Sequence, residues 1–168
     1  MTTIRRATPD DGRAVAEVKI ETWRVTYVDV MPQPVLDALD VDEHERIWAG
    51  YAAADGLGVF VADDAGRIVG FVSVGPCREP PGIGELYAIY VRPGSWDTGV
   101  GLALMEAGVE WLADRWTEAV LWVAEENPRA RRFYELYGWT PETTRVEEVA
   151  PGARIAEVRY RLSGLDRR

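Results

Sequence analysis

The sequence predicts an α/β (α+β) fold, and three observations support this prediction. Strand-like runs rich in β-branched and aromatic residues alternate with amphipathic helical patterns along the whole chain. No linker-like run, low-complexity segment or internal repeat interrupts the alternation, and 168 residues suffice for one hydrophobic core. The central stretch Glu85–Met105 reads as strand, glycine-bearing loop and helix. We therefore expect a single domain spanning residues 1–168, with elements in the order β-α-α-β-β-β-α-β-α-β-β.

The first third of the chain is expected to be mainly helical. Thr3–Ala7 reads as a short strand. Thr8 then supplies an N-cap and Pro9 suits the first helical position, so a helix is predicted from Pro9 to about Tyr27. A proline-rich turn at residues 31–34 separates this helix from a second helical region, Val35–Ala54.

Two strands and a loop follow. Leu57–Ala62 and Arg67–Val74 form a predicted hairpin around the turn at residues 63–66. The loop 75–84 holds three prolines and Cys77, and nothing near this thiol in the sequence would lower its pKa, so a bystander is favoured over a nucleophile. A single cysteine also excludes an intramolecular disulfide and a cysteine metal cluster, and no metal is expected.

The central segment has the character of an anion-binding unit. Glu85–Val91 is strand-like, and Gly99 and Gly101 open a helix. The apolar residues of that helix recur at helical spacing: Val100, Ala103, Leu104, Ala107 and Trp111. A glycine loop at a helix N-terminus directs backbone N–H groups and the positive end of the helix dipole to one point, which suits a phosphate or pyrophosphate.

Two familiar phosphate-binding loops fit this segment poorly. A P-loop needs Lys and Ser/Thr where Val100 and Gly101 stand, so no side chain would reach a γ-phosphate or hold magnesium. A dinucleotide fingerprint needs a third glycine where Leu104 stands. Neither a nucleotide triphosphatase nor a dinucleotide enzyme is expected.

The last third supplies a strand, a helix and a closing hairpin. Ala119–Ala124 is strand-like. Asn127 is a good N-cap for a helix that Gly138 ends. Val146–Val149 and Ile155–Leu162 form the closing hairpin around a Pro-Gly turn.

The central segment resembles motif A of the GCN5-related N-acetyltransferases, the GNAT superfamily. Four residues fall on the family pattern: Val91, Pro93, Gly99 and Gly101. Two positions depart from it, because Trp96 stands where Arg or Gln is usual and Asp97 stands where a further Gly is common. A carboxylate beside a diphosphate is repulsive unless its side chain points away.

A second stretch, Asn127–Trp139, resembles motif B of the same family. Its matching residues are Asn127, Ala130, Phe133, Tyr134 and Gly138, with Trp139 as the last aromatic residue. An ordinary capped amphipathic helix is the alternative for this stretch alone. Two motifs in the family order and spacing favour the GNAT superfamily.

The resemblance implies the GNAT fold. That fold has a central, mostly antiparallel mixed sheet of about seven strands with helices on both faces, and its fourth and fifth strands are splayed apart. It also implies acetyl-CoA as co-substrate, with the pantetheine arm in the splay and the pyrophosphate at the glycine loop. Carried onto this chain, the cofactor-binding residues are Ile89, Tyr90, Val91, Trp96, Asp97, Thr98, Gly99, Val100, Gly101, Asn127 and Ala130.

The resemblance also implies two catalytic residues. Tyr134 matches the family's general acid, and a phenol suits that role because its pKa lies near that of the leaving thiol. Glu85 is the best candidate for the base, since strand alternation is expected to place it on the same face as Tyr87 and Ile89. A solvated glutamate at the strand end is the alternative.

The acceptor pocket is expected to involve aromatic residues. Trp23 and Tyr27 lie four residues apart, so they share a helix face and could cage an ammonium, with core packing as the alternative. Tyr87 is the third candidate. His44, the only histidine, is expected to be a packed or surface residue, which makes a Ser-His-Asp triad improbable.

These residues predict an N-acetyltransferase that moves the acetyl group directly to a primary amine of a small molecule. The alternatives are a peptide or protein N-terminus as acceptor, a larger acyl group, and a non-catalytic acyl-CoA-binding module. The formal net charge of −9 argues against nucleic acid and favours a cationic substrate. With no apolar leader and no run of eighteen apolar residues, we expect a cytoplasmic protein without a membrane span. A homodimer is possible through the edge of the closing hairpin.

Overall fold

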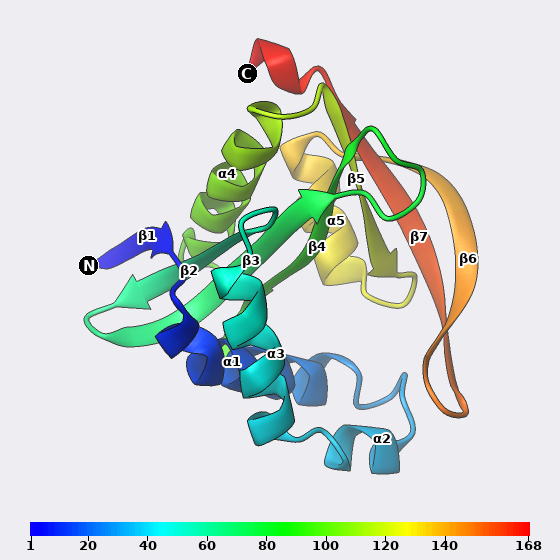
Figure 1. Cartoon of the computed structure of the whole chain (residues 1–168). Helices are drawn as coiled ribbons and strands as arrows, with labels where there is room; N and C mark the ends of the chain where they lie inside the picture. The colour runs from blue at the N-terminus through cyan, green and yellow to red at the C-terminus, as the bar shows by residue number, and fades with distance from the viewer.

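A seven-stranded sheet forms the centre of the computed structural model, which describes all residues 1–168 (Figure 1). The strands are β1 (Thr2–Arg6), β2 (Gly58–Asp64), β3 (Arg67–Pro76), β4 (Gly84–Val91), β5 (Glu118–Ala124), β6 (Thr140–Ala150) and β7 (Ala153–Ser163). Their order across the sheet is β1-β2-β3-β4-β5-β7-β6. Every neighbouring pair is antiparallel except β4 and β5, so the predicted mixed, mostly antiparallel sheet is confirmed.

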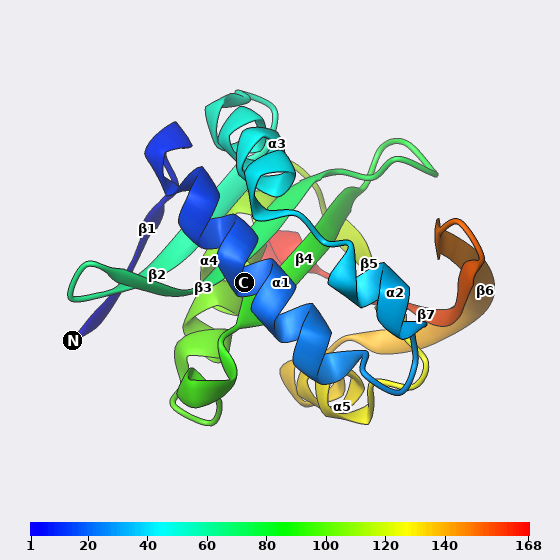
Figure 2. The same cartoon turned by 90° about the horizontal axis from the view of Figure 1, so that it is seen from below.

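Helices cover both faces of the sheet (Figures 1 and 2). The helices are α1 (Gly12–Thr26), α2 (Gln33–Asp37), α3 (Val41–Ala53), α4 (Val100–Ala113) and α5 (Pro128–Tyr137), with short 3-10 turns at Pro9–Asp11, Pro93–Ser95 and Leu165–Arg167. The first three lie on one face, and α4 and α5 lie on the other. None of them combines the length and the apolar character that crossing a membrane requires.

Three predicted boundaries were wrong. The region Val35–Ala54 is two helices rather than one, because Asp40 has an extended backbone and its carboxylate accepts the N–H groups of Asp42 and Glu43, which starts α3 afresh. The first helix begins with a 3-10 turn and becomes α-helical only at Gly12. The strand expected from Val146 begins at Thr140, since pairing with β7 compensates for its polar composition.

Packing against the sheet fixes the orientation of α4. Leu104, Met105 and Leu112 are fully buried in the largest hydrophobic cluster, between the sheet and the α4–α5 layer. Three such side chains contribute roughly 1.5–3 kcal/mol each by area removed from water. This packing holds the N-terminus of α4 at the carboxyl end of β4.

The two parallel strands separate after a short pairing, so the predicted splay is confirmed. Only Gly84, Glu85 and Leu86 of β4 pair with β5, opposite residues 119–121. The rest of β4 that is paired, from Ala88 to Val91, pairs with β3 alone. Its backbone groups that face away from β3 therefore have no strand partner.

Candidate active site

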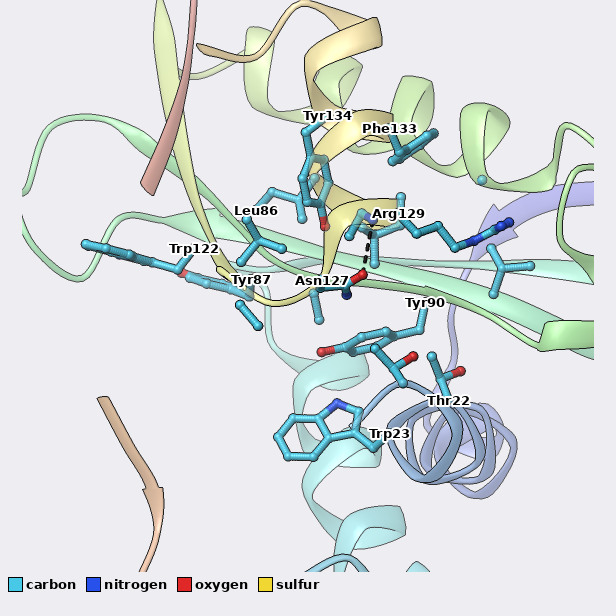
Figure 3. A pocket seen from close by; sticks show the side chains of 18 of the residues that line it. Thr22, Trp23, Leu86, Tyr87, Tyr90, Trp122, Asn127, Arg129, Phe133 and Tyr134 are labelled. Atoms are coloured by element: carbon cyan, nitrogen blue, oxygen red, sulfur yellow. Dashed lines mark hydrogen bonds between the residues drawn. The ribbon is translucent and has the colours of Figure 1, made fainter. Parts of the chain in front are cut away.

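One cavity of about 670 Å³ lies at the splay between β4 and β5 (Figure 3). Most of the residues predicted for the site line it: Trp23, Tyr27, Glu85, Tyr87, Ile89, Tyr90, Val91, Trp96, Asp97, Gly99, Gly101, Asn127, Ala130 and Tyr134. Thr98 and Val100 do not, because the Thr98 hydroxyl donates to the Ser95 carbonyl and the Val100 side chain is buried in the core under α4. The structure thus brings together residues from α1, β4, the glycine loop and α5.

A row of free backbone donors stands at one end of this cavity. The N–H groups from Asp97 to Leu102 make no hydrogen bond to any acceptor of the protein. Gly99 is the N-cap of α4 with a φ of 90°, a left-handed conformation that glycine adopts without strain, and no side chain caps the helix. Asp97, Gly99, Gly101 and Leu102 of this row line the cavity, so their donors and the positive end of a fourteen-residue helix are available to an anionic group.

Trp96 and Asp97, the two residues that depart from the family pattern, both contact Arg129. The Trp96 indole N–H donates to the Val91 carbonyl over 2.8 Å, which anchors the loop to the end of β4. Arg129 of α5 lies 4.2 Å above the Trp96 ring, and its Nη2 is 3.3 Å from Asp97 Oδ1. The Asp97 carboxylate is mostly exposed and has a cationic partner, so it does not face the cavity as an isolated charge.

Replacing Asp97 by asparagine is expected to strengthen acetyl-CoA binding modestly. Asn tolerates the left-handed φ of 60° that Asp97 adopts, while one negative charge near the anion site disappears and Arg129 is released. We expect the Kd to fall roughly threefold at low salt and the gain to shrink as salt screens it. Calorimetric titration at two salt concentrations measures this. A weaker Kd for the asparagine variant would show that the Asp97–Arg129 pair supports the loop.

The open edge of β4 presents its backbone to the cavity. The N–H of Arg92 donates to the Val69 carbonyl over 2.8 Å, so Arg92 points toward β3. By alternation along the strand, the N–H and C=O groups of Ile89 and the N–H of Val91 point into the gap, while the Val91 carbonyl already accepts the Trp96 indole N–H. These groups can bond an extended ligand chain as a missing strand would.

A bulge in β4 overturns one expectation about side-chain direction. Ser73 pairs with Ala88 and Val74 pairs with Leu86, so Tyr87 is an extra residue in the strand. The Ile89 side chain consequently packs on the α4 side, whereas Ala88 and Tyr90 pack on the α1 side. The prediction that Glu85 and Ile89 share a face was wrong, because alternation assumed an unbroken ladder.

Tyr134 has the environment of a proton donor. Its side chain is buried, its hydroxyl makes no hydrogen bond to the protein, and Figure 3 shows that hydroxyl pointing from α5 into the cavity. Burial, with a smaller contribution from Tyr90, raises the pKa of Tyr134 well above its usual range. The phenol therefore stays protonated at every physiological pH.

Asn127 lies beside Tyr134 as the N-cap of α5. Its Oδ1 accepts the N–H of Ala130 over 3.2 Å, as the dashed line in Figure 3 marks. The oxygen is used by the helix, so the side-chain NH₂ is the group that remains for a ligand.

Glu85 is buried and paired, not solvated. Its exposed fraction is 3%, which excludes the alternative of a water-exposed glutamate. Arg78 contacts both oxygens, with Nη2 2.6 Å from Oε2 and the backbone N–H 3.4 Å from Oε1. The Arg78 side chain is itself largely exposed, so the partner of this buried carboxylate lies at the solvent side of the pair.

The aromatic pair on α1 both lines the cavity and packs. The rings of Trp23 and Tyr27 meet edge to face, 5.2 Å apart, so the shared helix face is confirmed. Tyr27 also belongs to a cluster with Leu36 and Ile155, which supports the packing alternative as well. The ammonium of Lys19, the chain's one lysine, lies 5.0 Å from the Trp23 ring, and burial lowers its pKa.

Two further sequence expectations concern residues outside the cavity. His44 and Cys77 do not line it. Cys77 is buried, and that burial raises the pKa of its thiol, as expected for a bystander.

Sequence reasoning missed a group of charged and aromatic residues on the cavity wall. They are Arg78, Trp122, Arg129, Arg132, Arg145 and Glu157. Alternation in β5 could have indicated Trp122, because its neighbours Leu121 and Val123 face the core cluster on the α4–α5 side. No sequence pattern indicated Glu157, whose position depends on the pairing of β7 with β5.

Comparison with known proteins agrees with this geometry. Residues 20–139 match the Acetyltransferase (GNAT) family. An uncharacterized N-acetyltransferase of Bacillus subtilis, YuaI, is 38% identical over 169 residues, covering 98% of this chain and 88% of that protein.

Solved structures share the fold. PaiA N-acetyltransferase of Thermoplasma acidophilum in complex with coenzyme A superposes with a TM-score of 0.79 at 18% identity, over 97% of this chain and 99% of the other. YncA of Salmonella typhimurium, an acetyltransferase solved with acetyl-CoA, gives 0.73 at 22% identity, over 99% and 95%. The chain belongs to the GNAT family and is an acyltransferase of that type.

Proposed function

We propose that this enzyme transfers an acetyl group from acetyl-CoA directly to a primary amine of a small molecule. The observation that carries the proposal is that free N–H groups of the row from Asp97 to Leu102 lie on the same cavity as the unpaired Tyr134 hydroxyl. Acetyl transfer from acetyl-CoA needs a site for the diphosphate of CoA and a proton donor for the departing thiolate, and this cavity has candidates for both.

The residues on the cavity fit the parts of acetyl-CoA. The N–H row suits the diphosphate, and Arg132, which has no carboxylate partner, adds a cation at that end. The inward-facing backbone of Ile89 and Val91, with the Asn127 amide, suits the amide groups of the pantetheine arm. Bound there, the co-substrate supplies an activated acetyl thioester.

Three groups of the chain would then act on the reaction. A backbone N–H near Ile89 polarises the thioester carbonyl and stabilises its developing negative charge. Tyr134 donates its proton to the departing sulfur. Glu85 accepts the proton of the attacking amine through water once Arg78 has moved. Direct transfer is favoured because Cys77, the chain's one thiol, lies outside the cavity.

Packing between the α1–α2 region and the β6–β7 hairpin covers part of the cavity, and we call this cover the roof. The roof favours a small acceptor over a protein chain. Met31 and Leu36 of the α1–α2 region pack with Ile155 and Val149 of the β6–β7 hairpin. Figures 1 and 2 show α2 beside the tip of that hairpin. A roof of this kind encloses a compact amine, whereas a protein N-terminus needs an open groove for the residues that follow it.

Calorimetric titration with acetyl-CoA and with CoA, followed by thiol release with a panel of amines, tests the proposal. Micromolar binding and amine-dependent release of CoA thiol are expected. Failure of both ligands to bind would contradict the cofactor assignment. Acetylation of peptides only would contradict the small acceptor.

A further inference from the structure

Glu157 lines the cavity on the side of α1 and α2, which we call the acceptor side. The mechanism above gives this carboxylate no role. Its neighbour Val158, and Tyr160, pack into the cluster on the α4–α5 side. Alternation along β7 therefore turns Glu157 to the other face, where α1 and α2 lie. Glu157 pairs across the sheet with Ala124, the last residue of β5, and its side chain is only 16% exposed.

The ion pair of Glu157 can open without leaving a bare charge. Arg145 Nε lies 3.0 Å from Glu157 Oε1 and 3.6 Å from Glu147 Oε2, and its guanidinium lies 3.9 Å from the Trp122 ring. If a ligand ammonium takes the place of Arg145 at Glu157, Arg145 keeps Glu147 and the ring face. An uncompensated buried charge, the usual cost of breaking such a pair, does not arise.

Glu85 is assigned a different role. Its one cationic partner is Arg78, which is largely exposed and also lies 5.3 Å from the Tyr87 ring, so this pair can open as well. In the proposed reaction, however, Glu85 accepts a proton, and a carboxylate that becomes protonated cannot remain the counter-charge of an ammonium. Of the two carboxylates on the acceptor side, Glu157 is therefore the one left to receive a cation.

The charge balance of the cavity limits the number of ammonium groups it can take. On the acceptor side each carboxylate already has one arginine, Arg78 for Glu85 and Arg145 for Glu157. The surplus cation of the cavity, Arg132, belongs to α5 and makes no ion pair, so it adds positive charge rather than compensating an ammonium. Nothing on the acceptor side compensates a second or third ligand ammonium.

The remaining wall on the acceptor side is mainly apolar and aromatic, with Thr22 and Thr26 of α1 as its aliphatic hydroxyl-bearing members. Its apolar and aromatic members are Trp23, Tyr27, Met31, Tyr87, Trp122 and Ile155. Such a wall favours a hydrocarbon or ring next to the amine, by burial of apolar surface and by aromatic contacts.

We propose that Glu157 receives the ammonium of the acceptor and that the acceptor is a primary monoamine with an aromatic or apolar body. This inference rests on the proposed acetyl transfer. Glu157 draws in the ammonium form, which loses one proton through water to Glu85 before it reacts. The N–C bond then forms as the C–S bond breaks, Tyr134 protonates the sulfur, and the second proton lost by nitrogen returns to Tyr134.

The experiment compares Glu157→Gln with Glu157→Asp, using 2-phenylethylamine and spermidine as probes. In wild type, thiol release is expected to be faster with 2-phenylethylamine than with spermidine at equal concentration. Glu157→Gln should raise the KM for 2-phenylethylamine about 10-fold, the order expected for a lost charge-assisted contact, while kcat and the KM for acetyl-CoA change little. Glu157→Asp, which keeps the charge, should recover most of this loss.

A matched control variant and a binding measurement distinguish failure of the Glu157 inference from failure of the proposed acetyl transfer. Glu142 lies on the same hairpin, pairs with Arg159 and Arg161, and does not line the cavity. Glu142→Gln should leave the KM for 2-phenylethylamine unchanged. An unchanged KM in Glu157→Gln, a preference for spermidine, or no binding of 2-phenylethylamine to the CoA-saturated protein would overturn the inference. Turnover of any other small primary amine would still support the acetyltransferase.

Discussion

Replacing Tyr134 by phenylalanine is expected to lower kcat by roughly 10–10³-fold while the Kd of acetyl-CoA stays nearly unchanged. The change removes one hydroxyl that has no protein partner and keeps the ring, which packs 5.7 Å from the Phe133 ring and 6.2 Å from the Tyr160 ring. Folding should therefore be preserved. Single-turnover and steady-state kinetics separate the chemical step from binding.

The pH profile gives this prediction a second readout. Burial raises the pKa of Tyr134, so the phenol remains a proton donor as the pH rises, and the wild-type rate should not lose its acid below about pH 10. The control is Tyr137→Phe, since Tyr137 lies on the same helix but outside the cavity, near Arg168. A kcat for Tyr134→Phe that equals the control would remove Tyr134 from the mechanism.

Replacing Gly101 by valine is expected to weaken acetyl-CoA binding at least roughly 30-fold, because the side chain would stand among the N–H groups that approach the diphosphate. The protein itself has room for a Cβ at this position. A Cβ at Gly101 would meet only Phe133 ring carbons at 3.7 and 3.8 Å and a Val91 methyl at 3.9 Å, which are ordinary contacts. The loss should therefore appear in the Kd measured by calorimetry while the Tm changes little.

Gly94 provides the matched control for this substitution. It lies in the same loop, is exposed, and a Cβ there would meet nothing within 4 Å. Gly94→Val should bind acetyl-CoA as the wild type does. Tight binding by Gly101→Val would mean that the ligand lies elsewhere, whatever the control shows.

Much of the fold could be predicted because local signals and two motifs agreed. Asn127, Pro128 and Gly138 mark the ends of α5 where the structure has them. The bulge at Tyr87 could not be predicted, because it depends on the register between β3 and β4. The break at Asp40 was available as a local N-cap signal, but the surrounding helical periodicity concealed it.

The site was predictable where residues lie close in sequence and not where charges meet across it. Arg129 balances the charge of Asp97 from 32 positions away in the sequence. Arg145 of β6 lies opposite Glu157 on the neighbouring strand β7. Similarly, the net charge of −9 predicted an acidic attraction for a cation, yet the cavity wall carries four arginines and three carboxylates. The excess of acidic residues lies outside the cavity, so the net charge of the chain did not predict the charge of the site.

The position of Lys19 has a practical consequence for work with this enzyme. An acetyltransferase incubated with its own co-substrate commonly offers many surface lysines as adventitious acceptors. Here the one lysine side chain is partly covered by the Trp23 ring, the arginine side chains remain protonated, and the α-amine of Met1 is the one other amine. Acetylation of the enzyme itself should therefore contribute little signal when acetylated products are measured by mass spectrometry. For the same reason, the protein offers few sites for amine-directed labelling or surface coupling.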